Sequence, residues 1–162
     1  MYYVVLAYYS VHPLAAPLEE IARQKAFFAS RDFRGRIYIS EQGINGQASA
    51  LKAHADEYID WMKQDPRFAE VEFKLHPSSE HVFPKMTVKY RKQLVAIDQP
   101  VDFAKRGPHL SPEAWKQALA ARDENTLVLD VRNDYEWAVG HFEGADLPPL
   151  ETFRQFPEYA RK

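Results

Sequence analysis

The order of apolar segments in the first 76 residues constrains the fold most strongly. Residues 2–9 form a continuous aromatic and β-branched run, which is typical of a buried strand. Pro17 then opens a helical stretch with glutamates in its first turn, where carboxylates favour the helix dipole. A second strand is expected over residues 36–40 and a short third strand near 47–50. Between them lies EQGING, whose Asn-Gly pair predicts a chain reversal.

A second helix and a fourth strand complete this order. Ser49 is placed to cap a helix whose apolar residues recur at helical spacing, and Asp65-Pro66 ends it. Apolar Val71, Phe73 and Leu75 then alternate with polar residues, as in a half-buried strand. The order β-α-β-β-α-β predicts an α/β (α+β) chain with an N-terminal ferredoxin-like split βαβ, an antiparallel sheet with two helices on one face. This fold hosts many functions and decides none.

A basic segment follows, FPKMTVKYRKQLVAI, residues 83–97. Met86, Val88 and Tyr90 are expected on one side of a strand, with lysine, threonine and arginine on the other. The functional interpretation is a phosphate-contacting stripe with Tyr90 available for stacking. The alternative, which we favour on sequence alone, is a solvated strand edge blunted by lysine. The candidate RNA-binding residues are Lys85, Lys89, Tyr90, Arg91, Lys92, Lys105 and Arg106.

The second half begins a new domain and does not complete a sheet. Residues 1–98 are expected to form the first domain, 99–110 a proline- and glycine-containing linker, and 111–162 the start of a second α/β domain. Ser111-Pro112-Glu113 predicts a helix start, residues 126–131 a buried parallel strand, and the last residues another helix. A parallel strand needs neighbours, so we expect the chain to be part of a longer protein. Its unfinished sheet could also pair with a second copy as a homodimer.

The candidates for framing an active site are Asp130 and Arg132, at the C-terminal end of the expected second-domain strand, and His141, which follows them in the sequence. The structural alternative, favoured for Asp130, is that it accepts N–H bonds from the following turn. For Arg132 both interpretations remain open, and the structural one is that it pairs with a carboxylate such as Glu143. His141 could be a general acid or base, but a hydrogen-bonded structural histidine is the favoured interpretation.

The amino-acid composition excludes several kinds of functional site. The net charge is −2, so any nucleic-acid site must be a local patch. The chain contains no cysteine, which excludes disulfides and a thiol nucleophile within these 162 residues. Its histidines lack metal-site spacing, so no metal is assigned, and no other cofactor is evident. No apolar run reaches membrane-spanning length, and the absence of an export signal makes the cytoplasm the default.

Several motifs in matching order resemble one family. DVRNDYEWAVGHFEGA is similar to the N-terminal signature of rhodanese-like domains. GRIYISEQGINGQ, FPKMTVKYRKQLV, HLSPEAW and FRQFPEY all resemble the rhodanese-domain tRNA uridine hydroxylases. The resemblance implies an acylphosphatase-like N-terminal module followed by a rhodanese-like domain. It also implies hydroxylation of C5 of the wobble uridine in tRNA to 5-hydroxyuridine, with molecular oxygen as cosubstrate. The family's essential cysteine is expected beyond Lys162, so no catalytic residue is assigned in this chain.

Three other functions remain open. Rhodanese-type sulfur transfer would follow from the second half alone. A non-catalytic RNA- or protein-binding module would suit a chain without a thiol. Acylphosphatase-like hydrolysis would need an arginine and an asparagine at one phosphate, with Arg36 and Asn45 as the nearest candidates. The phosphate-cradling loop of acylphosphatases is absent after the first strand, where SVHPLAA stands.

Overall fold

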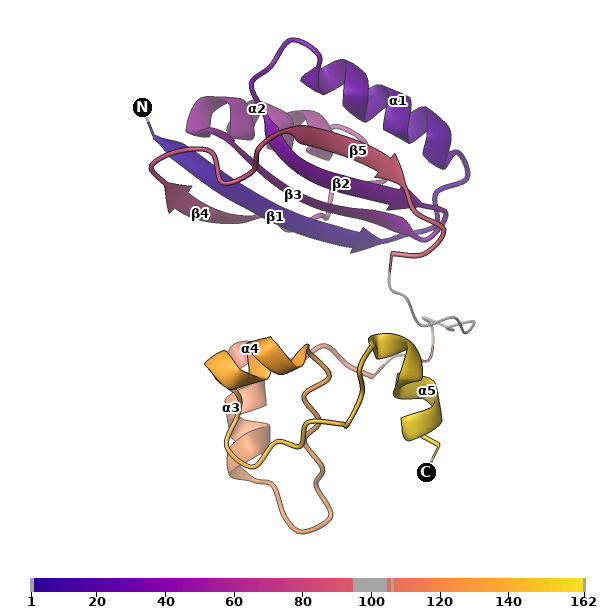
Figure 1. Ribbon diagram of the computed structural model, residues 1–162, viewed down its shortest axis with the longest axis vertical. Helices are drawn as coiled ribbons and strands as arrows, with labels where there is room; N and C mark the ends of the chain where they lie inside the picture. The colour runs from indigo at the N-terminus through magenta and orange to yellow at the C-terminus, as the bar shows by residue number, and fades with distance from the viewer. Residues whose placement is uncertain (1, 95–104, 106, 162) are drawn as a thin grey trace. The chain divides into compact units, whose positions relative to one another are not determined.

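A computed structural model describes residues 2–94, 105 and 107–161 of the chain (Figure 1). The chain divides into two compact units, Met1–Val95 and Ala96–Lys162. The first unit contains a five-stranded sheet and two helices. The second unit contains short helices joined by irregular segments.

The sheet of the first unit has the strand order β4-β1-β3-β2-β5. Its strands are β1 (Tyr3–Val11), β2 (Arg34–Ser40), β3 (Gly43–Leu51), β4 (Lys74–Ser78) and β5 (Met86–Tyr90). All neighbouring pairs are antiparallel except β2 and β5, which are parallel. Helices α1 (Pro17–Phe28) and α2 (Lys52–Lys63) lie on one face (Figure 1). The first four strands and two helices have the predicted split βαβ order, so the ferredoxin-like fold is confirmed.

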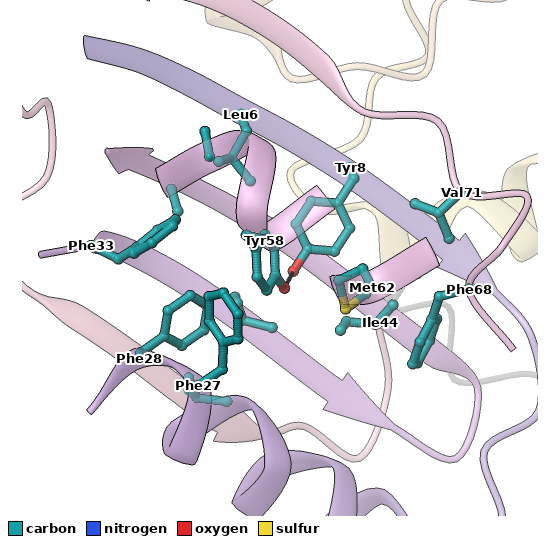
Figure 2. Close-up of a cluster of buried hydrophobic side chains, with 14 of the residues drawn as sticks. Leu6, Tyr8, Phe27, Phe28, Phe33, Ile44, Tyr58, Met62, Phe68 and Val71 are labelled. Carbon is teal, nitrogen blue, oxygen red and sulfur yellow. Dashed lines mark hydrogen bonds between the residues drawn. The ribbon is translucent and has the colours of Figure 1, made fainter. Parts of the chain in front are cut away.

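The core between the sheet and the helices is aromatic (Figure 2). Tyr58 of α2 is fully buried, and its ring centroid lies 5.3 Å from that of Phe27 and 5.1 Å from that of Phe28. Its hydroxyl donates to Gln24 at 2.8 Å and also bonds the Tyr8 hydroxyl of β1. Burial raises the pKa of the Tyr8 hydroxyl, so both phenols stay protonated. This cluster fixes the helices on the inner face of the sheet.

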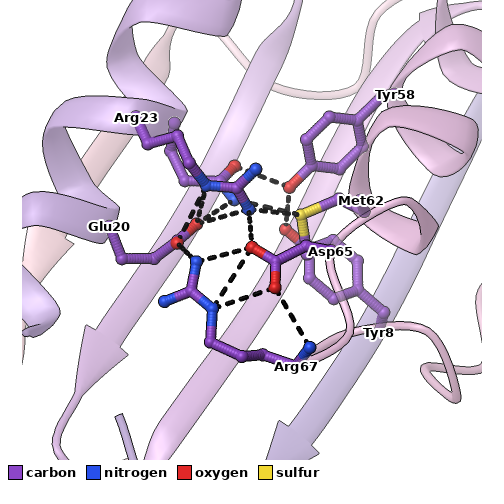
Figure 3. A network of polar contacts seen from close by, with 8 residues as sticks. Tyr8, Glu20, Arg23, Tyr58, Met62, Asp65 and Arg67 are labelled. Atoms are coloured by element: carbon purple, nitrogen blue, oxygen red, sulfur yellow. Dashed lines mark hydrogen bonds and ion pairs between the residues drawn. The ribbon is translucent and has the colours of Figure 1, made fainter. Parts of the chain in front are cut away.

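A buried charge network joins α1 to the segment after α2 (Figure 3). The fully buried Glu20 carboxylate accepts hydrogen bonds from Gln24 at 2.8 Å and Arg67 at 2.8 Å. Arg23 adds an ion pair to the same carboxylate at 3.0 Å. Asp65 pairs with both arginines, and the Arg67 guanidinium lowers the pKa of Asp65 to about 2. Every charge in the network has a partner, as a buried carboxylate requires.

Two local predictions, the turn at Asn45-Gly46 and the helix cap at Ser49, differ from the structure. The Asn45-Gly46 pair lies inside β3, while the reversal occurs at Glu41-Gln42 and Gly43 takes a φ of 139°. A Cβ on Gly46 would lie 2.3 Å from the Tyr8 ring, so this glycine is needed for packing across strands. Ser49 also lies in β3, and α2 begins after Leu51 without a side-chain cap.

The expected fourth strand begins later than its apolar pattern suggests. Strand β4 starts at Lys74, and Val71 and Phe73 precede it. Val71 is nonetheless 5% exposed, and Phe73 packs against the core cluster. The alternation of apolar and polar residues here results from burial of Val71 and Phe73 in an irregular segment, and it does not indicate the hydrogen bonding of a strand.

The second unit keeps the expected helix starts but not the expected strand. Helix α3 (Pro112–Ala120) is capped by Ser111, whose hydroxyl accepts from the Ala114 N–H at 3.2 Å. Helix α4 (Asp134–Val139) begins with a capping box, and the 3₁₀ turn η2 (Phe153–Gln155) leads into α5 (Phe156–Tyr159). Over 126–131 the structure has one isolated parallel bridge, between Leu129 and Asp146. The strand prediction was wrong because no further strand is paired with this segment in the part described.

Candidate nucleic-acid interface

The sheet face opposite the helices is here called the outer face. Near the β5 edge of the sheet it carries basic side chains of β2 and β5. The register aligns Ile37 with Val88 and Ile39 with Tyr90 on the inner face. Side chains alternate along a strand, so Arg36 and Tyr38 of β2 and Lys89 of β5 lie on the outer face. The expected alternation of β5 is therefore present, and its outer residues adjoin a second basic strand, β2.

Arg91 extends this basic surface beyond the end of β5. Its backbone N–H donates to the Ile39 carbonyl at 2.9 Å, which keeps it against β2. Its guanidinium lies 4.7 Å from the centroid of the Tyr38 ring. A hydrogen bond from Arg91 lowers the pKa of Tyr38, and the charges of Arg36 and Lys89 act in the same direction. Positive charge is thus concentrated around one aromatic ring, a combination suited to binding an anion with planar groups.

Tyr90 does not belong to this surface. It pairs with the buried Ile39 on the inner side, and its hydroxyl donates to the Glu41 carboxylate at 3.0 Å. That bond raises the pKa of Tyr90. It lines a depression of about 560 Å³ with the start of α1 and with two glutamates, Glu19 and Glu41. Tyr90 thus lies beside acidic groups on the side opposite Lys89, as the alternation of β5 predicted, and its role in stacking on RNA stays a prediction.

The other candidate basic residues are spread along the chain. Lys85 and Lys92 flank β5 and are exposed. Lys105 is described and exposed, whereas Arg106 lies outside the described residues, as do residues 99–104 of the expected linker. The structure gathers Lys89 and Arg91 with Arg36, a residue that the sequence suggests only as a candidate for phosphate hydrolysis. Arg36 and Asn45 lie on neighbouring strands of the outer face, where Arg36 pairs with Gln47, two residues along β3 from Asn45.

The loop between β4 and β5 covers one end of the outer face. Its His81 accepts or donates a hydrogen bond at Ser49 Oγ, at 3.0 Å from Nδ1, and its ring lies 4.6 Å from that of Tyr3. His81 Nε2 lies 3.2 Å from the Asp32 carboxylate. A serine, a histidine and an aspartate are thus in line, but Ser49 is fully buried and also accepts from the Val82 N–H. The arrangement anchors the loop and presents no accessible nucleophile.

In the second unit Asp130 and Arg132 pair with each other. Arg132 donates two bonds to the Asp130 carboxylate, at 2.9 and 2.5 Å, and a third to the Gly140 carbonyl at 2.7 Å. The Arg132 backbone N–H also donates to Asp130, as the structural interpretation expected. The arginine holds the pKa of Asp130 below its usual range. Arg132 thus pairs with a carboxylate, as the structural interpretation expected, but the partner is Asp130 rather than Glu143.

Asp130 and Arg132 line a small depression of about 90 Å³ together with residues 150–153. His141 lies elsewhere, with its ring stacked on Trp137 at 3.7 Å and its Nδ1 3.1 Å from the Trp137 carbonyl. The structure therefore brings two of the three framing candidates to one hollow. The third has the hydrogen-bonded setting of a structural histidine.

Two features are absent from the residues that the structure describes. Within residues 2–94, 105 and 107–161 there is no group of three or more acidic or histidine side chains arranged to hold a metal ion. No helix in these described segments is long and apolar enough to cross a bilayer.

Comparison with known proteins places the first unit in a family. Residues 3–94 match the model of the UPF0176 acylphosphatase-like domain. The chain is 53% identical over 158 residues to a protein of Chlamydia trachomatis serovar L2 named tRNA uridine(34) hydroxylase, covering 98% of this chain and 48% of that one. Relatives of the same name in Chlamydia pneumoniae and Protochlamydia amoebophila are 49% and 50% identical, covering 99% and 98% of this chain and 49% of each relative.

The chain thus spans about half the length of the curated relatives it matches. Among solved structures, BlrB, a BLUF protein in its dark state, is 24% identical with a TM-score of 0.49, over 60% of this chain and 79% of that one. We infer nothing about function from that likeness. From the match over residues 3–94, the chain belongs to the family of the UPF0176 acylphosphatase-like domain.

Proposed function

We propose that the protein to which this chain belongs hydroxylates C5 of the wobble uridine of tRNA, giving 5-hydroxyuridine with molecular oxygen as cosubstrate. The observation that carries this proposal is the identity of about 50%, over nearly the whole chain, to relatives named tRNA uridine(34) hydroxylase. The partner is therefore tRNA, and the compartment is the cytoplasm, where tRNA is modified.

The two units have different roles in this proposal. The outer face of the first unit contacts RNA, with Arg36, Lys89 and Arg91 neutralising phosphates. Their concentration in a chain of net charge −2 favours this role over a merely solvated edge.

The second unit is the beginning of a rhodanese-like catalytic domain. Its motif DVRNDYEWAVGHFEGA forms a tight ion-paired turn followed by the capped helix α4, which supports a scaffolding role. With no cysteine among the 162 residues, this chain alone supplies no thiol for catalysis.

A gain-of-function assay tests the activity. The full reading frame of the gene and, separately, the 162-residue chain are expressed in a bacterial host whose tRNA lacks 5-hydroxyuridine and its derivatives. Wobble nucleosides are then quantified by mass spectrometry. We expect 5-hydroxyuridine with the full reading frame and none with the 162-residue chain. Sulfur transfer from thiosulfate without 5-hydroxyuridine would favour a sulfurtransferase and contradict the proposal.

A further inference from the structure

One row of side chains crosses four strands of the outer face in register. Tyr9 of β1 pairs with Asn45 of β3, Asn45 pairs with Tyr38 of β2, and Tyr38 pairs with Lys89 of β5. Neighbouring strands lie about 4.8 Å apart, so the two tyrosines are about 10 Å apart on either side of an asparagine. The next row consists of Lys74, Ala7, Gln47, Arg36 and Thr87.

The two tyrosines are available to a ligand. Tyr9 is 65% exposed, whereas the preceding Tyr8 is 4% exposed and belongs to the core. The adjacent tyrosines thus point to opposite faces, and only Tyr8 packs against the helices. Tyr38 is half-buried, with the Arg91 guanidinium over its ring. The loop that covers Ser49 reaches the second row at Arg36, whose guanidinium lies 5.8 Å from the centroid of the Phe83 ring, while Tyr9, Asn45 and Lys89 of the first row are exposed.

The side chains of the two rows favour a particular class of ligand. They contain no acidic side chain, while Lys74, Arg36 and Lys89 are cationic and Arg91 adjoins them. The exposed amide of Asn45 lies between the tyrosines and that of Gln47 in the next row, and both can donate and accept hydrogen bonds. Anionic backbone, flat rings and hydrogen-bonding edges are the features that such a surface would complement.

Stacking on the two tyrosine rings favours unpaired nucleotides over a duplex. Bases in a duplex are stacked on one another and cannot stack on protein rings, whereas splayed single-stranded bases can. A solvated edge blunted by lysine would not need two tyrosines aligned with it on the same row. The combination therefore favours single-stranded RNA over double-stranded RNA as the occupant.

We propose that the outer face around Tyr9, Asn45, Tyr38 and Lys89 is a stacking platform for unpaired nucleotides of RNA. Tyr9 and Tyr38 stack on bases, the amide of Asn45 bonds a base edge, and the neighbouring cations bind phosphates. This inference rests on the proposed function only for the choice of RNA as the ligand. It goes beyond that function by naming the strand state that is bound and the face that binds it.

The test measures binding of the 162-residue chain to a fluorescein-labelled oligouridylate and to an RNA duplex of equal length, by fluorescence anisotropy. We expect the single strand to bind more tightly than the duplex. Tyr9→Leu and Tyr38→Leu should each weaken single-strand binding about tenfold, which is the usual scale for loss of one stacked base. Tyr90→Leu, on the opposite face, is the matched control and should bind as the wild type does.

Circular dichroism and thermal melting establish that each variant is folded. Equal binding of duplex and single strand, or unchanged binding by both folded outer-face variants, would overturn the platform. Loss of binding in the Tyr90 variant alone would assign the ligand to the other face and overturn it as well. These outcomes are independent of the nucleoside assay: a protein that binds single-stranded RNA here but makes no 5-hydroxyuridine would contradict the proposed activity and leave the platform standing.

Discussion

Replacement of Lys89 and Arg91 by glutamine should change how RNA binding depends on salt. Both cations lie on the outer face, one in the row of the tyrosines and one over the Tyr38 ring. Each phosphate neutralised on a single strand contributes about −0.7 to the slope of log K against log salt concentration. If each cation contacts one phosphate, the double variant should have a slope shallower by about 1.4. Between about 50 and 200 mM salt, the wild type should lose about sevenfold more affinity than the variant loses.

The assay is a salt titration of oligouridylate binding by fluorescence anisotropy. Its matched control is the Lys25→Gln/Lys63→Gln variant, which changes the net charge equally but replaces exposed lysines of α1 and α2 on the helix side. We expect the control to keep the wild-type slope. Equal slopes in all three proteins would refute the assignment of phosphate contacts to the outer face. A shallower slope in both variants would show that only net charge matters.

Three further predictions concern stability. Gly46→Ala should destabilise the first unit by about 1–3 kcal/mol in urea denaturation, since its Cβ would lie 2.3 Å from the Tyr8 ring. Wild-type stability should decrease as the pH falls from about 4 toward 2, because Arg67 lowers the pKa of Asp65 to about 2 in the folded state. Asp65→Asn should lack that part of the decrease, and an identical pH profile would contradict the assignment. Ser111→Ala should cost about 1 kcal/mol in local stability of α3, seen as faster amide exchange.

The order of elements in the first unit could be predicted from the sequence because each element has its own local pattern. The alternation that buries Leu6 and Tyr8 and the proline at the start of α1 each act within a few residues. The errors arose where a residue serves a distant partner. Gly46 looks like a turn residue but makes room for the Tyr8 ring, and Ser49 looks like a cap but binds His81.

The candidate site was predictable only in part for the same reason. The two-sided pattern of residues 85–91 predicted that Lys89 and Arg91 share a face, and the pairing of Lys89 with Tyr38 and the position of Arg91 over the Tyr38 ring agree with it. It could not show that Tyr38 and Tyr9 lie in line with Lys89, because these residues come from strands joined by long-range pairing. Tyr90 is next to the cations in sequence, but the strand pleat turns it toward Glu41.

The most direct test of the account measures 5-hydroxyuridine in tRNA when the complete protein carries variants of the outer face. In the host lacking this nucleoside, the unaltered full reading frame and the Lys25→Gln/Lys63→Gln version should both produce it. The Lys89→Gln/Arg91→Gln version, present at the same protein level, should produce much less. Equal amounts of 5-hydroxyuridine from all three versions would contradict the claim that the outer face binds the tRNA that is hydroxylated.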